Sequence, residues 1–169
     1  MSRILKAIER MMAMDEAAWA RHANPWSVWT RMAILPLAAL TIWSRVWIGW
    51  AALGPLALLL IWVWLNPRAF PPPRTTDHWA ARATFGERVL LNRAAVPIPA
   101  HHRRAATILG TVAGLGLVPL AWGLWALDAW AVGCGLLLTV GGKLWFLDRM
   151  VWLYQDMAPH VPAYRTWLR

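Results

Sequence analysis

The fold of this chain is decided by two long apolar stretches, and the second, Ala105–Leu147, reads AATILGTVAGLGLVPLAWGLWALDAWAVGCGLLLTVGGKLWFL. The first stretch is Met32–Leu65, and a charged residue stands near the middle of each, Arg45 in the first and Asp128 in the second. Even the shorter stretch would be about 50 Å long as one helix, against a hydrocarbon core of about 30 Å. Length therefore predicts that each stretch crosses a membrane twice, as a helical hairpin with the charge at its tip.

The overall composition is typical of a membrane protein. Of the 169 residues, 59% are hydrophobic and 15% charged, and 15 are Trp, several times the share expected in a soluble domain. This apolar content excludes a disordered chain, and Cys134, the only cysteine, excludes a disulfide framework. The net charge of +9 is first an orienting signal in such a protein, so we expect no nucleic-acid partner.

Basic residues are concentrated outside the two apolar stretches, near both termini and in the central segment. The positive-inside rule places such segments on the cytoplasmic side. We therefore predict an all-α integral membrane protein of the bacterial cytoplasmic (inner) membrane, with four transmembrane helices in two hairpins and both termini cytoplasmic. The expected spans lie near Val28–Ser44, Val46–Leu65, Ala105–Leu127 and Ala129–Leu147.

This topology divides the chain into two hairpins, residues 28–65 and 105–147, and three cytoplasmic segments, residues 1–27, 66–104 and 148–169. The central segment opens with NPRAFPPPR, a stiff polyproline-type exit from the membrane. It continues with Thr76–Arg93, an amphipathic pattern interrupted by Gly86. We expect this helix, and surface helices in both terminal segments, to lie at the interface beside anionic lipids.

Ionisable residues that could support catalysis inside a membrane are nearly absent from the expected spans. Lys143 is the deepest, and we interpret it as a side chain that extends to the interface. The alternative is a polar cluster of Lys143 with Asp148 and Arg149. Arg45 and Asp128 are expected to pair across the two tips. We predict no catalytic residue and no cofactor.

All five histidines fall in the expected cytoplasmic segments. His101 and His102 are adjacent, and Asp156 and His160 are four residues apart, so the three histidines are weak candidates for a surface metal site. The repeated His boxes with which membrane hydroxylases and desaturases bind iron do not occur here. We therefore favour an interfacial role for the adjacent pair and predict no bound metal.

Small residues are concentrated in the second hairpin. Gly110 and Gly114 form a Gly-x-x-x-Gly motif, and Gly133 and Gly141 lie in the fourth expected span. Small residues allow membrane helices to approach closely. We therefore predict that these four glycines make the close contacts of a single helical bundle.

Four strings of sequence carry a resemblance to a known family: WARHANPWSVWTR, WLNPRAFPPPR, GERVLLNR and GKLWFLDRMVWLYQDM, in this order. Over Trp19–Met157 the chain resembles a family of small, uncharacterised multi-span membrane proteins of bacteria and haloarchaea. That family has no established activity, so the resemblance implies the topology and no catalytic residue. It draws attention to polar residues at the cytoplasmic face, of which we expect these to contact a partner: Arg68, Asp77, Glu87, Arg88, Asp148 and Arg149.

Three functions are compatible with these observations. The leading hypothesis is a non-enzymatic accessory, assembly or scaffold subunit of a larger membrane complex, or a self-associating protein, with a membrane protein or a second copy as partner. The first alternative is a small oligomeric transporter or channel, although none of the eight acids is expected at mid-depth. The second is a cytoplasmic-face membrane enzyme that uses a His and carboxylate site.

Overall fold

The computed structural model describes residues 16–169, and within them every regular element is helical, as predicted. Most of the expected N-terminal surface helix falls on residues 1–15, outside the described residues. The elements are α2 (Glu16–His22), α3 (Pro25–Trp43), α4 (Arg45–Ile48), the 3₁₀ helix η1 (Gly49–Ala52), α5 (Leu53–Ala69), α6 (Trp79–Leu91), α7 (Ala100–Leu115), α8 (Leu117–Ala126), α9 (Ala129–Leu136), the π-helical η2 (Leu137–Gly141), α10 (Gly142–Met157) and α11 (Pro162–Arg165).

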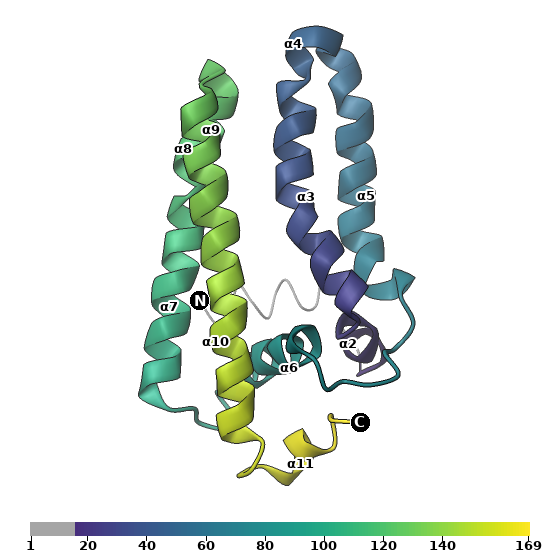
Figure 1. Ribbon diagram of the computed structural model, residues 1–169, viewed down its shortest axis with the longest axis vertical. Helices are drawn as coiled ribbons and strands as arrows, with labels where there is room; N and C mark the ends of the chain where they lie inside the picture. Colours follow the sequence, from purple (N-terminus) through teal and green to yellow (C-terminus); the bar gives the residue numbers. More distant parts are fainter. Residues whose placement is uncertain (1–15) are drawn as a thin grey trace.

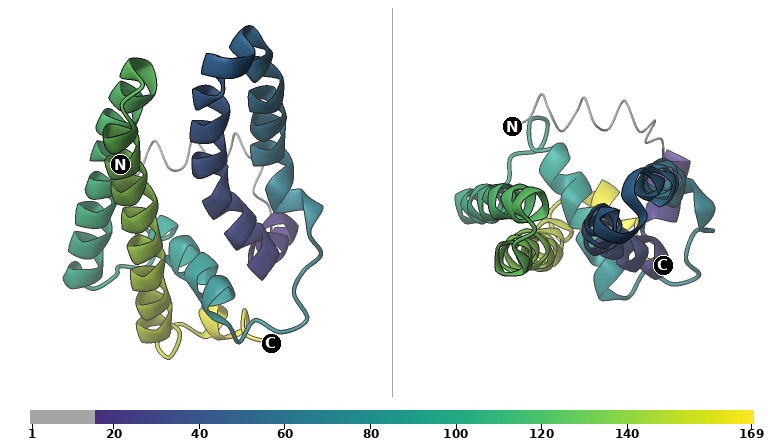
Figure 2. Two further views of the ribbon diagram at one scale, coloured as in Figure 1. Left: turned by 45° about the horizontal axis from the view of Figure 1, so that its top comes forward. Right: turned by 90° about the horizontal axis from the view of Figure 1, so that it is seen from above.

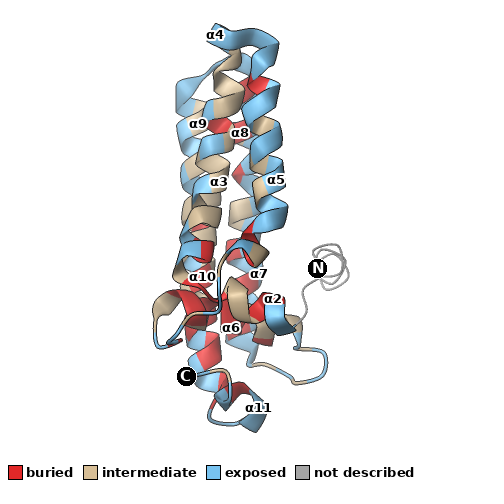
Figure 3. Ribbon diagram, turned by 90° about the vertical axis from the view of Figure 1, so that its right-hand side faces the viewer, coloured by how far each residue is buried: buried red, intermediate tan, exposed pale blue. Residues whose placement is uncertain are grey.

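Among the described residues, three helical runs are long and apolar enough to cross a membrane: Pro25–Ala69, Ala100–Ala126 and Ala129–Met157. The first contains 45 residues and bends back at its middle, so that α3 and α5 lie side by side (Figure 1). The other two runs form a second pair beside the first. Many large apolar side chains along these runs are exposed, as a membrane-spanning surface requires. Figure 3 shows that much of the length of these runs is exposed.

The two tips turn by different means. In the first, α4 and η1 meet at Gly49, whose φ of 54° lies in the left-handed region that favours glycine. In the second, Leu127 adopts φ 57°, and Asp128 caps α9 by accepting hydrogen bonds from the backbone N–H groups of Trp130 (2.9 Å) and Ala131 (3.1 Å). Both charged residues expected at the tips therefore lie at the turns.

Glycines bring the arms of the second hairpin together, but they are not the expected ones. A Cβ on Gly123 would lie 2.5 Å from the Val132 nitrogen, and a Cβ on Gly135 would lie 2.6 Å from the Leu120 Cα. Gly116 and Gly142 are also in tight contact with the facing arm, Gly116 with Thr139 and Gly142 with Ala113. By contrast, the four predicted positions make no such contact. A Cβ added there would meet no neighbouring atom within 4 Å, and these positions are Gly110, Gly114, Gly133 and Gly141.

The hairpins touch near their tips and are joined at the opposite end. Ala39 of α3 packs against Leu120 and Leu124 of α8 in a small apolar cluster. At the other end lies the base, by which we mean α2, α6, the C-terminal half of α10, and α11 (Figures 1 and 2). The largest buried cluster lies in the base, as the concentration of buried residues in Figure 3 shows.

The helix α6 is the centre of the base and not the half-exposed interfacial helix that the pattern predicted. One side packs against α10 through Phe85, Val89 and Tyr154, and the other packs beneath α3 through Ala80, Ala83 and Val28. Gly86, interpreted as an interruption, allows this packing, since a Cβ there would lie 2.9 Å from the Met150 Cα and closer still to its carbonyl group.

Candidate functional site

Four ionisable side chains from four different helices meet where the hairpins join the base. We call them the inner polar cluster: His22 of α2, Arg31 of α3, Glu87 of α6 and Lys143 of α10. The Lys143 Nζ lies 2.5 Å from the Glu87 Oε1, and the Arg31 Nη1 lies 2.8 Å from the His22 Nδ1. The two pairs lie close enough to act on each other electrostatically, since the charge of Lys143 reaches the His22 imidazole.

The electrostatics of the inner polar cluster keep His22 neutral. Burial, and then the positive charges of Arg31 and Lys143, hold the pKa of the His22 imidazole well below its ordinary value of 6.5. Its Nδ1 therefore accepts the hydrogen bond from Arg31, and its proton resides on Nε2. With His22 neutral, two cations face one carboxylate, so the cluster carries one positive charge in excess.

A neutral hydrogen-bond network lies beside the cluster and joins the lower ends of α3 and α5. The Ser27 hydroxyl donates to the Asn66 Oδ1 (2.8 Å), and the Asn66 Nδ2 donates to the Thr30 Oγ1 (2.7 Å). Asn66 is fully buried, so this network satisfies polar groups that lipid could not. Nearby, Asn24 caps α3 and donates to the Pro71 carbonyl (3.0 Å), which fixes the polyproline exit.

Three of the residues expected to contact a partner instead make contacts inside the chain. Glu87 belongs to the inner polar cluster. Arg88 pairs with Glu16, and its guanidinium carbon lies 4.4 Å from the centre of the Trp167 ring. The Asp148 Oδ1 accepts a hydrogen bond from the Trp79 Nε1 (3.2 Å). Three of the six charged residues that the sequence assigned to an interface therefore make contacts within the chain instead.

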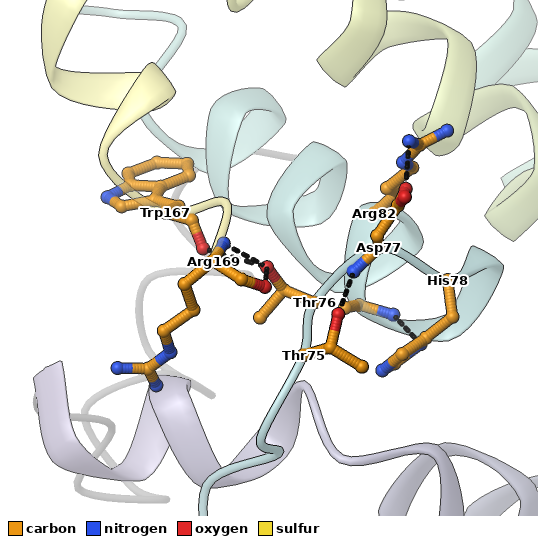
Figure 4. Close-up of polar contacts among 8 residues, drawn as sticks. Thr75, Thr76, Asp77, His78, Arg82, Trp167 and Arg169 are labelled. Atoms are coloured by element: carbon orange, nitrogen blue, oxygen red, sulfur yellow. Dashed lines mark hydrogen bonds and ion pairs between the residues drawn. The ribbon is translucent and has the colours of Figure 1, made fainter.

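The other three expected contact residues lie nearer the surface. Asp77 is exposed and pairs with Arg82 at the start of α6 (Figure 4). The Arg68 guanidinium carbon lies 4.4 Å from the centre of the Trp64 ring, and that of Arg149 lies 4.8 Å from the centre of the Trp152 ring. The structure therefore does not gather the six residues into one patch.

The C-terminal residues are held against the segment that leads into α6. The Thr76 N–H donates to the Arg169 carbonyl (2.7 Å), and the Arg169 N–H donates to the Thr76 Oγ1 (2.8 Å), as Figure 4 shows. Thr76 and Tyr164 are buried. The expected C-terminal surface helix is thus replaced by a continuation of α10 to Met157 and by the short α11, both packed into the base.

The tip charges do not pair with each other. Arg45 donates instead to the carbonyl oxygens of Leu124 and Trp125 (3.2 Å to the latter), and no ion pair between Arg45 and Asp128 occurs in the described part of the chain. The expected link between the hairpins exists, but the end of α8 provides the acceptors. Carbonyl groups at a helix C-terminus attract a cation because they have no partner within the helix.

The three histidines considered as weak metal candidates divide into a pair, His101 and His102, and a single residue, His160. His101 and His102, in the first turn of α7, face Asp156 in the last turn of α10, and the His102 Nε2 lies 2.7 Å from the Asp156 Oδ2. His101, His102 and Asp156 form the group of potential metal ligands found within residues 16–169. His160 is exposed and does not belong to this group.

Two hollows lie on the base. One, of about 440 Å³, is open and is lined by Arg82, Tyr154 and Arg165 among others. The second, of about 130 Å³, lies between Trp19 and Arg88. Both arginines of the larger hollow are already engaged, Arg82 by Asp77 and Arg165 by backbone carbonyls, so among the described residues neither hollow presents a set of unpaired catalytic groups.

Sequence reasoning identified Glu87 and Lys143 but did not bring them together, and it did not single out Arg31 as a site residue. The available signal was an arginine inside the first expected span, Val28–Ser44, and a lysine inside the fourth. Comparison with known proteins adds one match: a model for a "Family of unknown function (DUF6653)" covers residues 3–167. This agrees with the resemblance to an uncharacterised family. No curated protein and no solved structure matches.

Proposed function

The chain belongs to DUF6653, a family of unknown function, and we propose that it is a non-enzymatic, four-span protein of the bacterial cytoplasmic membrane. In this proposal it acts as an accessory or scaffold subunit, by association with another membrane protein or a second copy of itself. Both termini and the base face the cytoplasm, where anionic lipids surround the basic residues.

The distribution of charge supports this topology. The stretch from Arg68 to Arg104, which joins the two hairpins, contains seven arginines, whereas the two tips have only Arg45 and Asp128 as charged residues. Phosphatase fusions test it, because the enzyme is active only outside the cytoplasm. A fusion after Arg93 should be inactive and one at Arg45 active; activity after Arg93 would contradict four crossings with an internal base.

The observation that carries the association is the open glycine face of the second hairpin. Gly110 and Gly114 are exposed on one face of α7, although glycine in a helix costs about 1 kcal/mol relative to alanine. Four other glycines of this hairpin offset that cost by close contact within the chain, and these two do not. Lipid covers a larger side chain equally well, so the open glycines fit best against a neighbouring helix.

Weighing the intact assembly tests the association. The protein is extracted from its native membrane in mild detergent, and native mass spectrometry distinguishes a monomer, a self-oligomer and a complex with another protein. We expect an assembly larger than the monomer, and Gly114→Leu should shift it toward the monomer. Ala57→Leu, at an exposed position of α5, is the matched control.

Two results would overturn the proposal: a monomer for the wild-type protein extracted this way, or equal effects of Gly114→Leu and Ala57→Leu. At the base, we expect Arg149→Glu to release a partner and leave membrane insertion intact. Arg88→Glu does not provide a clean test of the interface, because Arg88 pairs with Glu16 and contacts Trp167 inside the base.

The transporter alternative receives less support than association. Small transporters that couple to protons use a carboxylate within the membrane. Here Asp128 caps α9 at a tip and Glu87 pairs with Lys143 at the base. The enzyme alternative depends on the group formed by His101, His102 and Asp156.

A further inference from the structure

Three side chains with the chemistry of metal ligands converge where α7 begins and α10 ends. The His102 Nε2 lies 2.7 Å from the Asp156 Oδ2, and the His101 Nε2 lies 4.0 Å from the same oxygen. The two imidazole rings are 4.1 Å apart between centroids, and one potential ligand atom from each of the three residues lies within 4.8 Å of the others. The ends of α7 and α10 therefore hold two imidazoles and a carboxylate in one place.

A hydrogen bond that only packs two helices together would explain His102 and Asp156, but not the rest of the group. His102 is 1% exposed, and its Nδ1 is buried with no hydrogen-bond partner among the described residues. Coordination of an ion through the His102 Nε2 leaves this Nδ1 as it is, so the observation that points to a ligand is the second imidazole beside the same carboxylate. His101 is mostly exposed, and yet its ring lies against the His102 ring, tilted by 42°, beside the same carboxylate.

The distances fit a metal ion after small side-chain rotations. Bonds of about 2.0–2.2 Å in a tetrahedral site place neighbouring ligand atoms about 3.3 Å apart, between the two distances observed here. His101 and Asp156 are both more than half exposed and free to rotate, whereas His102 is fixed by burial. Two imidazoles and one carboxylate suit zinc and similar divalent transition metals better than calcium or magnesium.

We propose that His101, His102 and Asp156 form a binding site for a divalent transition metal, with zinc as the reference ion. Three protein ligands leave a fourth position for water, and the bound ion joins the start of α7 to the end of α10. The neighbouring Arg103 and Arg104 weaken the affinity by repulsion, but both are exposed and screened by water. The site is independent of the proposed association.

Metal titration of the full chain in detergent tests this proposal. The protein is purified with an affinity tag that contains no histidine, stripped with a chelator, and titrated with Zn²⁺ by calorimetry and with Co²⁺ by visible absorption. We expect about one ion per chain and a zinc-dependent rise in thermal stability, because binding to the folded state is linked to unfolding.

Three variants locate the ion. His101→Ala and Asp156→Asn should each reduce the affinity at least about tenfold and abolish the zinc-dependent rise in stability. Both variants leave the buried His102 in place. In Asp156→Asn, the amide oxygen can still accept the hydrogen bond from His102, so we expect the fold to be retained. His160→Ala, an exposed histidine outside the group, is the control and should bind like the wild-type protein.

Failure to bind one equivalent of Zn²⁺ or Co²⁺ would overturn the proposal. So would binding that His101→Ala and Asp156→Asn leave unchanged, because the ion would then occupy another place. These results bear only on the metal site, since the association is measured by the mass of the assembly.

Discussion

Replacement of Gly86 by alanine tests the central contact of the base. A Cβ at this position would lie 2.9 Å from the Met150 Cα and closer to the Met150 carbonyl group. These are backbone atoms of α10, so no side chain can rotate away to make room. The variant must push α6 away from α10 and loosen the packing of Phe85 and Val89, which are buried in the same interface.

The size of the effect follows from two opposing contributions. Overpacking of a tight interface costs about 1–3 kcal/mol, and contact with backbone places this case near the upper end. Alanine in a helix recovers about 1 kcal/mol relative to glycine. We therefore expect Gly86→Ala to lower the free energy of unfolding by about 2 kcal/mol.

Thermal unfolding in mild detergent, followed by tryptophan fluorescence, measures this change. Gly54→Ala, in α5 of the other hairpin, provides the matched control, because a Cβ there meets no atom within 4 Å. It should raise stability by up to about 1 kcal/mol, so the two Gly→Ala changes have opposite signs. If Gly86→Ala is as stable as the wild-type protein, α6 does not pack on α10 as described.

Three further predictions concern the polar groups. The folded state holds the pKa of the His22 imidazole below 6.5, so at low pH the unfolded chain binds a proton that the folded chain does not. The free energy of unfolding should therefore decrease as the pH falls from about 7.5 to about 5. In thermal unfolding, His22→Gln should flatten this decrease, whereas the control His160→Gln should leave it unchanged. Arg45→Met should separate the two tips, measured as a longer distance between spin labels on them, because the carbonyls at the end of α8 lose their donor. Asp128→Asn should leave the free energy of unfolding unchanged, because Asn also caps helices, whereas Asp128→Ala should lower it by about 1 kcal/mol. If Asp128 acted through an ion pair with Arg45, both changes would lower the free energy of unfolding by similar amounts.

The sequence predicted the features that depend on local composition. Apolar length indicated helices that double back, and the charges near the middle of each stretch correctly indicated where the turns lie, at Arg45 and Asp128. The positions of glycines indicated close contact in the second hairpin but not which ones make it. The choice depends on the rotation of each helix about its own axis, and a sequence rich in apolar residues on all sides does not reveal that rotation.

The sequence did not predict contacts between residues far apart in the chain. Arg31 and Glu87 are each explicable as interfacial charges, and only the tertiary fold brings them to one place. The same applies to His102 and Asp156, which lie together because α10 continues to Met157. His160 was grouped with them on spacing alone, and the chain leaves the helix before reaching it.

Because α6 precedes the second hairpin in the chain but packs against α10 at that hairpin's end, the base cannot close while the protein is still being synthesised. The buried face of α6, with Ala81, Phe85 and Val89, stays uncovered until α10 has been synthesised. A chain that stops after α9 should consequently be degraded faster than the complete one, in a pulse-chase measurement of its lifetime. The pairing of α6 with α10 thus makes the burial of this apolar face depend on synthesis of the whole second hairpin.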